Sequence, residues 1–290
     1  MTAWQILAQP FAEFAFMRRA LVACFALALG SAPVGVLLVL RRMSLIGDAM
    51  GHAVLPGAAI GFVLAGLSLG AMALGGVIAG LVVAVLAGLV TRITPVREDA
   101  SFAGFYLMSL AFGVIVVSVK GSSVDLLHVL FGTILAVDDM SLIHVAGIAT
   151  VTLVALALLW RPLVADAFDP EFLPAQGERA WLYYTAFLVL VVLNLVAAFQ
   201  ALGTLMAVGL MMLPAVGARF WAASVAGQMA AAAVVAALAA ITGLLVSFHA
   251  GLPSGPAIVL AAGALWLVSL LFGARGGLLL RALPLRHLEA

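Results

Sequence analysis

Asp48 and His52 are the two side chains whose types and spacing most clearly suggest chemistry. They lie four residues apart at the start of a long apolar stretch. On an α-helix four residues advance about 400°, so the carboxylate and the imidazole share one face, one turn apart. Both groups bind divalent transition metals. The pattern predicts that this pair holds a metal ion in a passage for cations; a structural hydrogen bond between two polar side chains is the alternative.

Pro56 follows His52 by four residues in the same stretch. Proline has no N–H to donate to the His52 carbonyl, and its ring pushes against the preceding turn. We therefore expect a kink that frees a carbonyl oxygen as a third ligand. So small a ligand set predicts weak binding, which suits a transient stop on a transport path.

His249 is a second candidate, because it precedes the turn-rich segment Gly251–Pro256. We expect it on the outer side, where it would guide metal towards the path; an ordinary exposed loop histidine is the alternative. The single cysteine, Cys24, excludes an intrachain disulfide and a cysteine metal cluster. The chain also lacks the glycine-rich phosphate loop of nucleotide hydrolases. We predict no enzymatic activity and no bound cofactor for this chain alone.

Composition places the chain in a membrane. It is 66% hydrophobic and 9% charged, whereas soluble domains carry roughly 25% charged residues. We predict an all-α, polytopic membrane bundle of about eight transmembrane helices, with seven or nine as alternatives, because a bilayer core takes about 20 helical residues. Residues 203–218 form a short run broken by Pro214, and we expect a half-helix or re-entrant segment there. The candidate spans are 20–40, 46–66, 69–90, 101–119, 140–160, 181–200, 203–218, 224–248 and 255–273.

Residues 1–290 are predicted to form one transmembrane domain. Residues 1–19 mix aromatic and basic side chains and are predicted to lie as a helix in the membrane interface. The most polar connection, 161–180, is predicted to be cytoplasmic, as are 91–99 and the tail from Arg275, because basic residues favour that side. The N-terminal side stays open, since arginine pairs stand at both ends of the first span.

Five sequence elements resemble those of one transporter family. The stretch from Arg41 to Gly57, which contains both Asp48 and His52, is similar to the signature of the ABC-3 permease family. These permeases are the membrane subunits of bacterial zinc, manganese and iron importers driven by ATP. The other elements follow in the family's order, and together they span nearly the whole chain: Leu130–Leu135, Phe168–Phe172 with Gly177, Gly203–Arg219 and Leu252–Leu260.

The resemblance implies a permease subunit in the bacterial cytoplasmic (inner) membrane. It implies a homodimer with the metal path at or near the interface, two cytosolic ATP-binding subunits, and an extracytoplasmic metal-binding protein; no nucleic-acid partner is expected. Asp48 and His52 would be pathway residues. The polar connection would dock on the ATPase, which uses the ATP, through Asp166, Phe168, Asp169, Glu171 and Gly177.

Two departures from the family pattern stand out. Many relatives carry Asp where this chain has Gly251, so a gating carboxylate is absent or replaced by His249. The usual small residue after the Asp-x-Glu element is replaced by Phe172-Leu173-Pro174, which changes the docking contacts.

The sequence thus predicts an importer of a divalent transition metal. His52, with a possible contribution from His249, favours zinc as the cargo, with manganese or iron as the alternative. A proton-coupled secondary carrier or channel is the alternative from another class.

Overall fold

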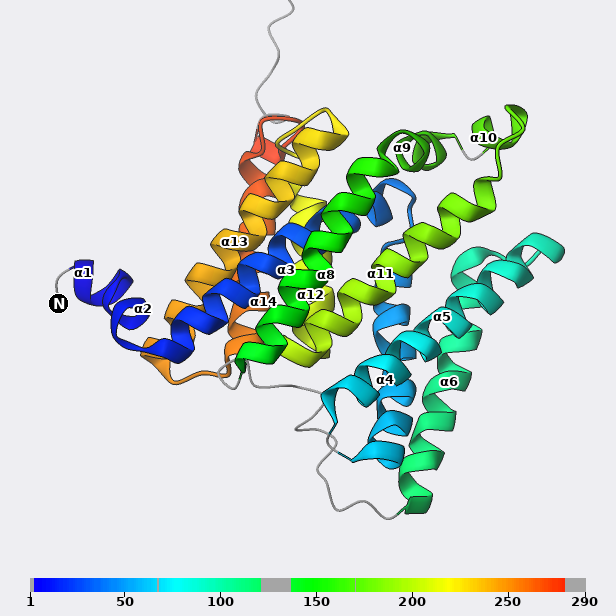
Figure 1. Cartoon of the computed structure of the whole chain (residues 1–290). Coiled ribbons are helices and arrows are strands. Elements are labelled where there is room, and N and C mark those ends of the chain that lie inside the picture. The colour runs from blue at the N-terminus through cyan, green and yellow to red at the C-terminus, as the bar shows by residue number, and fades with distance from the viewer. Residues whose placement is uncertain (1–2, 67, 121–136, 170, 280–290) are drawn as a thin grey trace, which may run out of the picture.

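The computed structural model describes residues 3–66, 68–120, 137–169 and 171–279, and all the regular structure within these ranges is helical (Figure 1). The family-like element Leu130–Leu135 lies outside the described residues. The helices are α1 (Ala3–Leu7), α2 (Gln9–Glu13), α3 (Ala15–Leu40), α4 (Ser44–Ala65), α5 (Leu69–Ile93), α6 (Glu98–Lys120), α8 (Asp139–Leu158), α9 (Trp160–Phe168), α10 (Phe172–Ala175), α11 (Ala180–Leu202), α12 (Thr204–Ala218), α13 (Val225–Ala250) and α14 (Ser254–Phe272).

Helix ends follow local chemistry. Ser68, Asp138 and Ser224 cap the starts of α5, α8 and α13, each side chain accepting a hydrogen bond from a backbone N–H in the first turn. Gly251 ends α13 in the left-handed conformation that glycine adopts at little cost. Short polar caps and glycine turns therefore separate long apolar helices, as the sequence predicts.

Eight of the described helices are long and apolar enough to cross a membrane. They are α3, α4, α5, α6, α8, α11, α13 and α14, and they match the predicted spans. The prediction of an all-α polytopic bundle is confirmed.

The short run at 203–218 forms one short helix, so the predicted short segment is confirmed, although the helix is not broken at Pro214. α12 runs through Pro214, and at about 1.5 Å per residue its 15 residues reach about 22 Å. It follows α11 after Gly203 alone, and the chain beyond it meets the end of α14, where Arg275 N–H donates to Phe220 O (2.9 Å). Within the described residues, eight helices are long enough to cross a membrane, and α12 is a shorter apolar helix packed among them.

Two ion pairs mark the opposite ends of the bundle. Arg19, near the start of α3, pairs with Asp139 at the start of α8 (2.8 Å). Arg41, just after α3, pairs with Asp166 of α9 (2.8 Å), in the polar connection assigned to the cytoplasm. The end of α3 therefore lies on the same side of the bundle as this polar connection, and the N-terminal segment lies at the opposite end. Arg19 is tolerated there because its charge is matched by Asp139.

The N-terminal segment is shorter than predicted. α1 and α2 stand outside the bundle (Figure 1), but α3 begins at Ala15, so residues 15–19 belong to the first membrane helix. Arg18 explains how the helix starts so early. Its guanidinium donates to Ala12 O (2.7 Å) at the end of α2, which lets a charged residue lie in the first turn of α3.

α4, α5 and α6 form a group at one side of the bundle, and α11 lies between this group and the other helices (Figure 1). Small residues bring α4 and α5 into backbone contact. A methyl group on Gly57 would overlap the carbonyl oxygen of Gly75, and one on Gly61 would overlap that of Ala71. Close packing through small residues is the usual way in which helices associate in lipid.

Candidate functional site

Asp48 and His52 lie one turn apart on α4, as their spacing predicts. His52 Nε2 is 3.8 Å from Asp48 Oδ1, close enough for both groups to contact one ion. The ring of His52 lies roughly parallel to that of Tyr106 on α6, with centroids 6.1 Å apart. Helix α4 thus supplies both candidate ligands, and α6 supports the imidazole.

The pair lies on an open face of the single chain. The side chains of His52 and Asp48 are 43% and 62% exposed, and the cavity described below is lined by other residues. On the neighbouring face of α4, Gly47 and Gly51 lie against Met211 and Val208 of α12. The expected passage is therefore not formed around the pair by one chain.

The ligand set within one chain is small. Among the described residues no three His, Cys, Asp or Glu side chains gather closely enough to hold a metal ion. α4 also continues through Pro56 as one helix, so a third ligand from a broken turn is not evident. If the pair holds a metal ion as predicted, its further ligands would have to come from water, from a protein that delivers the metal or from another chain.

His249 lies apart from this pair. It occupies the last turn of α13 and meets Phe248 edge-on at 5.4 Å. Phe248 in turn contacts Phe14 of the N-terminal segment, with centroids 5.3 Å apart. His249 therefore lies at the same end of the bundle as the N-terminal segment, and its predicted role as an outer guide stays a prediction.

The polar connection between α8 and α11 folds into two short helices, α9 and α10. Phe168 and Phe172 expose 68% and 45% of their surface, and Asp169 and Glu171 are exposed beside them. Asp169 Oδ1 accepts a hydrogen bond from the Glu171 N–H (3.0 Å), which turns the chain between the helices. Gly177 has a positive φ of 77° in open surroundings. This segment presents apolar and acidic side chains together.

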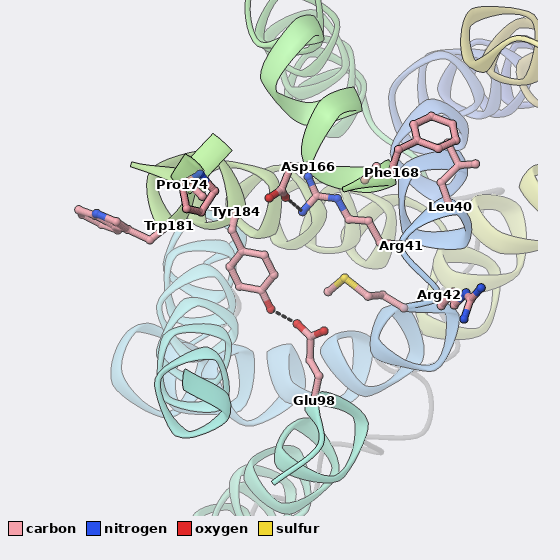
Figure 2. Close-up of a pocket in the computed structure, with 12 residues that line it drawn as sticks. Leu40, Arg41, Arg42, Glu98, Asp166, Phe168, Pro174, Trp181 and Tyr184 are labelled. Carbon is pink, nitrogen blue, oxygen red and sulfur yellow. Dashed lines mark hydrogen bonds and ion pairs between the residues drawn. The ribbon is translucent and has the colours of Figure 1, made fainter. Parts of the chain in front are cut away.

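Asp166 differs from the other predicted docking residues because its side chain is buried. It lines a cavity of about 710 Å³ at the end of the bundle where α9 lies, shown in Figure 2. Asp166 Oδ2 lies 2.8 Å from Arg41 Nη1. On the opposite wall the hydroxyl of Tyr184 donates a hydrogen bond to Glu98. The cavity thus joins the starts of α6 and α11 to α9 and to the link between α3 and α4.

Several contacts hold the guanidinium of Arg41 in place in this cavity. Its side chain is 5% exposed, its Nη2 donates to Leu163 O (3.4 Å), and its guanidinium carbon lies 4.4 Å from the centre of the Phe187 ring. Burial lowers the pKa of Arg41, whereas the carboxylate of Asp166 raises it. Since arginine holds its proton strongly, the group stays charged and requires its partner.

Sequence reasoning missed the roles of Arg41, Glu98, Tyr106 and Tyr184. Arg41 was noted as a basic residue at a helix end and as the first residue of the family signature, and Glu98 only as part of a polar link; neither was assigned a partner. Their partners lie far away in the chain, so local spacing carried no signal for either contact. The buried arginine became visible only once α9 was placed beside the end of α3.

Known proteins with similar sequences are membrane subunits of metal importers. The chain is 34% identical over 258 residues to the manganese import system permease protein ScaB of Streptococcus parasanguinis, covering 89% of this chain and 90% of that protein. It is 30% identical over 270 residues to the chelated iron transport system membrane protein YfeD of Yersinia pestis, covering 93% and 89%.

A solved structure shows the same fold. PsaBC from Streptococcus pneumoniae in complex with Fab contains a chain that matches with a TM-score of 0.83 and 30% identity, covering 94% of this chain and 98% of that one. The sequence profile of the ABC 3 transport family matches residues 13–273. The chain therefore belongs to the ABC 3 transport family and is the multi-pass permease of an ABC metal importer in the bacterial inner membrane.

Proposed function

We propose that this permease imports manganese, with ferrous iron as the alternative cargo. In this proposal Asp48 and His52 form a transient binding site for the ion on its transport path. The observation that carries the proposal is the 3.8 Å approach of a carboxylate and an imidazole on an open face of a membrane helix. Ionisable groups at such positions are costly and usually functional.

Manganese or iron fits this site better than zinc, which the sequence analysis favoured on the basis of His52 and a possible His249. The relatives are named for manganese and iron transport. Carboxylate oxygen suits hard Mn²⁺, and imidazole is also accepted by Fe²⁺. Structural and catalytic zinc sites usually have at least three protein ligands in tetrahedral geometry, and one chain offers only two here. The alternative cargo of the sequence prediction thus becomes the main proposal.

A second copy of the chain would complete the path. A carboxylate that is 62% exposed on an otherwise apolar helix is unfavourable against lipid, so another surface must cover it. A homodimer joined across this face would bring together two Asp48–His52 pairs. Four ligands then surround one ion, and water completes the shell that manganese prefers.

The partner ATPase would dock on α9 and α10. Phe168 and Phe172 are exposed aromatic anchors, and Asp169 and Glu171 add negative charge beside them. Exposed aromatic side chains of this kind are common at the centres of protein interfaces. Gly177 would allow the turn that presents the segment. On the other side of the membrane, His249 would meet the metal delivered by an extracytoplasmic binding protein.

In this account the ion leaves the binding protein, exchanges water for the carboxylate and imidazole, and moves inward when the helices re-pack. Asp48 neutralises part of the ion's charge, and His52 supplies a neutral nitrogen ligand while Tyr106 fixes its ring. Weak binding by few ligands lets the ion leave again. ATP binding and hydrolysis in the partner would drive the re-packing.

Metal uptake by the reconstituted complex tests the proposal. The permease, its ATPase and its binding protein are placed in liposomes, and entry of Mn²⁺, Fe²⁺ and Zn²⁺ is measured with and without ATP. Manganese should enter fastest and only with ATP. Faster zinc entry would restore the zinc assignment, and uptake driven by a proton gradient without ATP would identify a secondary carrier.

A further inference from the structure

The Arg41–Asp166 ion pair joins two segments that the function requires to act together. Asp166 belongs to α9, in the proposed docking segment, and Arg41 belongs to the link that leads into α4. Their charged atoms are 2.8 Å apart, and the side chains are 5% and 10% exposed. Figure 2 shows the two groups meeting across the wall of the cavity at the end of the bundle where α9 lies, with Phe168 on the same helix end.

The contact holds Arg41 to α9 by more than charge. Nη2 of Arg41 also donates to Leu163 O in the same helix, and its guanidinium packs over the Phe187 ring of α11. A planar guanidinium held by two groups on one side and a ring on the other has little freedom to turn. The end of α3 therefore follows α9 if α9 moves.

The backbone carries the same constraint into α4. Arg41, Arg42 and Met43 form the whole link between the two helices. Arg42 N–H donates to Val39 O (3.2 Å), and Met43 N–H donates to Leu38 O (2.8 Å), a Schellman turn with Arg42 in the left-handed conformation (φ 59°). Met43 is buried. These contacts fix the conformation of the link between α3 and α4. Asp48 lies one helical turn after Ser44, the first residue of α4.

Separating the two charges is costly in this setting. Each group is nearly removed from water, and a buried charge without its partner is strongly unfavourable. The nearby cavity is also lined by Glu98 and Arg42, but Glu98 is engaged by Tyr184 and Arg42 is exposed. Arg41 therefore remains the ion-pair partner of Asp166. This contact holds α9 and the start of α4 together as one unit.

We propose that the Arg41–Asp166 pair is the link through which movement of the docking segment reaches α4 and the Asp48–His52 pair. This inference rests on the proposed function, because it assumes that α9 receives the ATPase motion. Arg41 and Asp166 are positioning residues, since neither contacts the ion. Breaking the pair should uncouple ATP hydrolysis from metal entry.

The test compares uptake with hydrolysis in the reconstituted complex. In Asp166→Asn the amide keeps the shape of the side chain but loses its charge, and Mn²⁺ taken up per ATP should fall about tenfold. The matched control is Asp139→Asn, which removes the same charge from the exposed Arg19–Asp139 pair at the other end of α3 and should leave the ratio at the wild-type value. A wild-type ratio in Asp166→Asn would overturn the proposal.

A second measurement shows whether the Arg41–Asp166 pair transmits movement to α4 or has a merely structural role. Hydrogen–deuterium exchange is followed in residues 44–52 and 160–168 of the complex as ATP is added. Wild type and Asp139→Asn should respond in both segments, whereas Asp166→Asn should respond in 160–168 only. Equal responses of 44–52 in both variants would contradict the proposal. The exchange measurement does not depend on which metal is transported. Failure of the manganese proposal would appear as absent Mn²⁺ uptake by the wild type, so it can be distinguished from failure of the Arg41–Asp166 proposal.

Arg41→Lys provides a second test of the proposal if Asp166→Asn does not assemble with the ATPase. Lysine retains the positive charge near Asp166 but loses the contact with Leu163 O and the planar packing over Phe187. Mn²⁺ uptake per ATP should then fall partway, and exchange in residues 44–52 should respond less to ATP. A lysine variant with wild-type values in both measurements would overturn the proposal.

Discussion

Gly57 of α4 and Gly75 of α5 lie backbone to backbone, so that a methyl group on either residue would overlap the carbonyl oxygen of the other. Ala79 also approaches Gly57 from α5. This contact sets how closely α4 packs on α5, and α4 carries Asp48 and His52 on a different face. The position of the candidate metal ligands therefore depends on residues that have no chemistry of their own.

Gly57→Ala should destabilise the permease by about 1–3 kcal/mol, because over-packing forces two backbones apart. Gly70→Ala is the matched control on α5, since a side chain there meets open space. It should be neutral or slightly stabilising, as alanine favours helix by about 1 kcal/mol over glycine. Thermal unfolding of the purified protein in detergent measures both changes. Equal melting temperatures for the two variants would contradict the packing argument.

A buried hydrogen bond should hold α11 to α8. Asn194 Nδ2 donates to Thr152 Oγ1 (2.8 Å), and both side chains are buried. Thr152→Val removes the acceptor, which should cost about 0.5–2 kcal/mol in unfolding free energy. Thr150→Val lies on the exposed side of the same helix, where the hydroxyl bonds only to Ala146 O, and it should cost little. The idea fails if both valine variants unfold alike.

Arg42 occupies the left-handed region at φ 59°, where a residue with a side chain pays about 1–2 kcal/mol. Arg42→Gly should therefore leave the permease as stable as the wild type or stabilise it by about 1 kcal/mol. Arg41→Gly, one residue earlier, should destabilise it because Asp166 loses its partner. Unfolding in detergent compares the two, and a loss of stability in Arg42→Gly would argue against the Schellman turn.

Tyr106 should matter for transport through its ring rather than its hydroxyl. Its ring lies against that of His52, and such contacts are worth about 0.5–1.5 kcal/mol. Tyr106→Phe should keep Mn²⁺ uptake near the wild-type rate, whereas Tyr106→Ala should reduce it roughly two- to tenfold. Initial uptake rates in liposomes decide the matter, and a phenylalanine variant as impaired as the alanine variant would assign the role to the hydroxyl.

The membrane helices could be predicted because hydropathy and turn residues are local properties. Predicted spans such as 69–90 and 255–273 agree with α5 and α14 to within a few residues. Pro214 misled the prediction for α12, since neighbouring helices support a proline-containing turn that would be unfavourable alone. The start of α3 was placed too late because Arg18 and Arg19 were assigned to an interfacial helix together with the aromatic residues before them. In the structure, contacts with Ala12 and Asp139 satisfy both arginines at the start of α3.

The candidate site was predictable only in part. Helical spacing was sufficient to place Asp48 beside His52. Its exposure on the surface of one chain could not be foreseen, because a sequence does not tell which face of a membrane helix its neighbours leave open. The pairing of Arg41 with Asp166 is a tertiary contact between distant segments, and neither residue carries a local sign of its partner.

The most direct test asks whether the Asp48–His52 pair handles the transported ion. Mn²⁺ uptake per ATP is measured for Asp48→Asn and His52→Gln in the reconstituted complex. The matched controls Asp99→Asn and His144→Gln change exposed groups elsewhere. The account predicts that Mn²⁺ uptake per ATP falls at least about tenfold in Asp48→Asn and His52→Gln, because loss of a group that merely supports a metal ligand already costs this much. Both controls should keep the wild-type value. Wild-type uptake in Asp48→Asn and His52→Gln, with the complex intact, would contradict it.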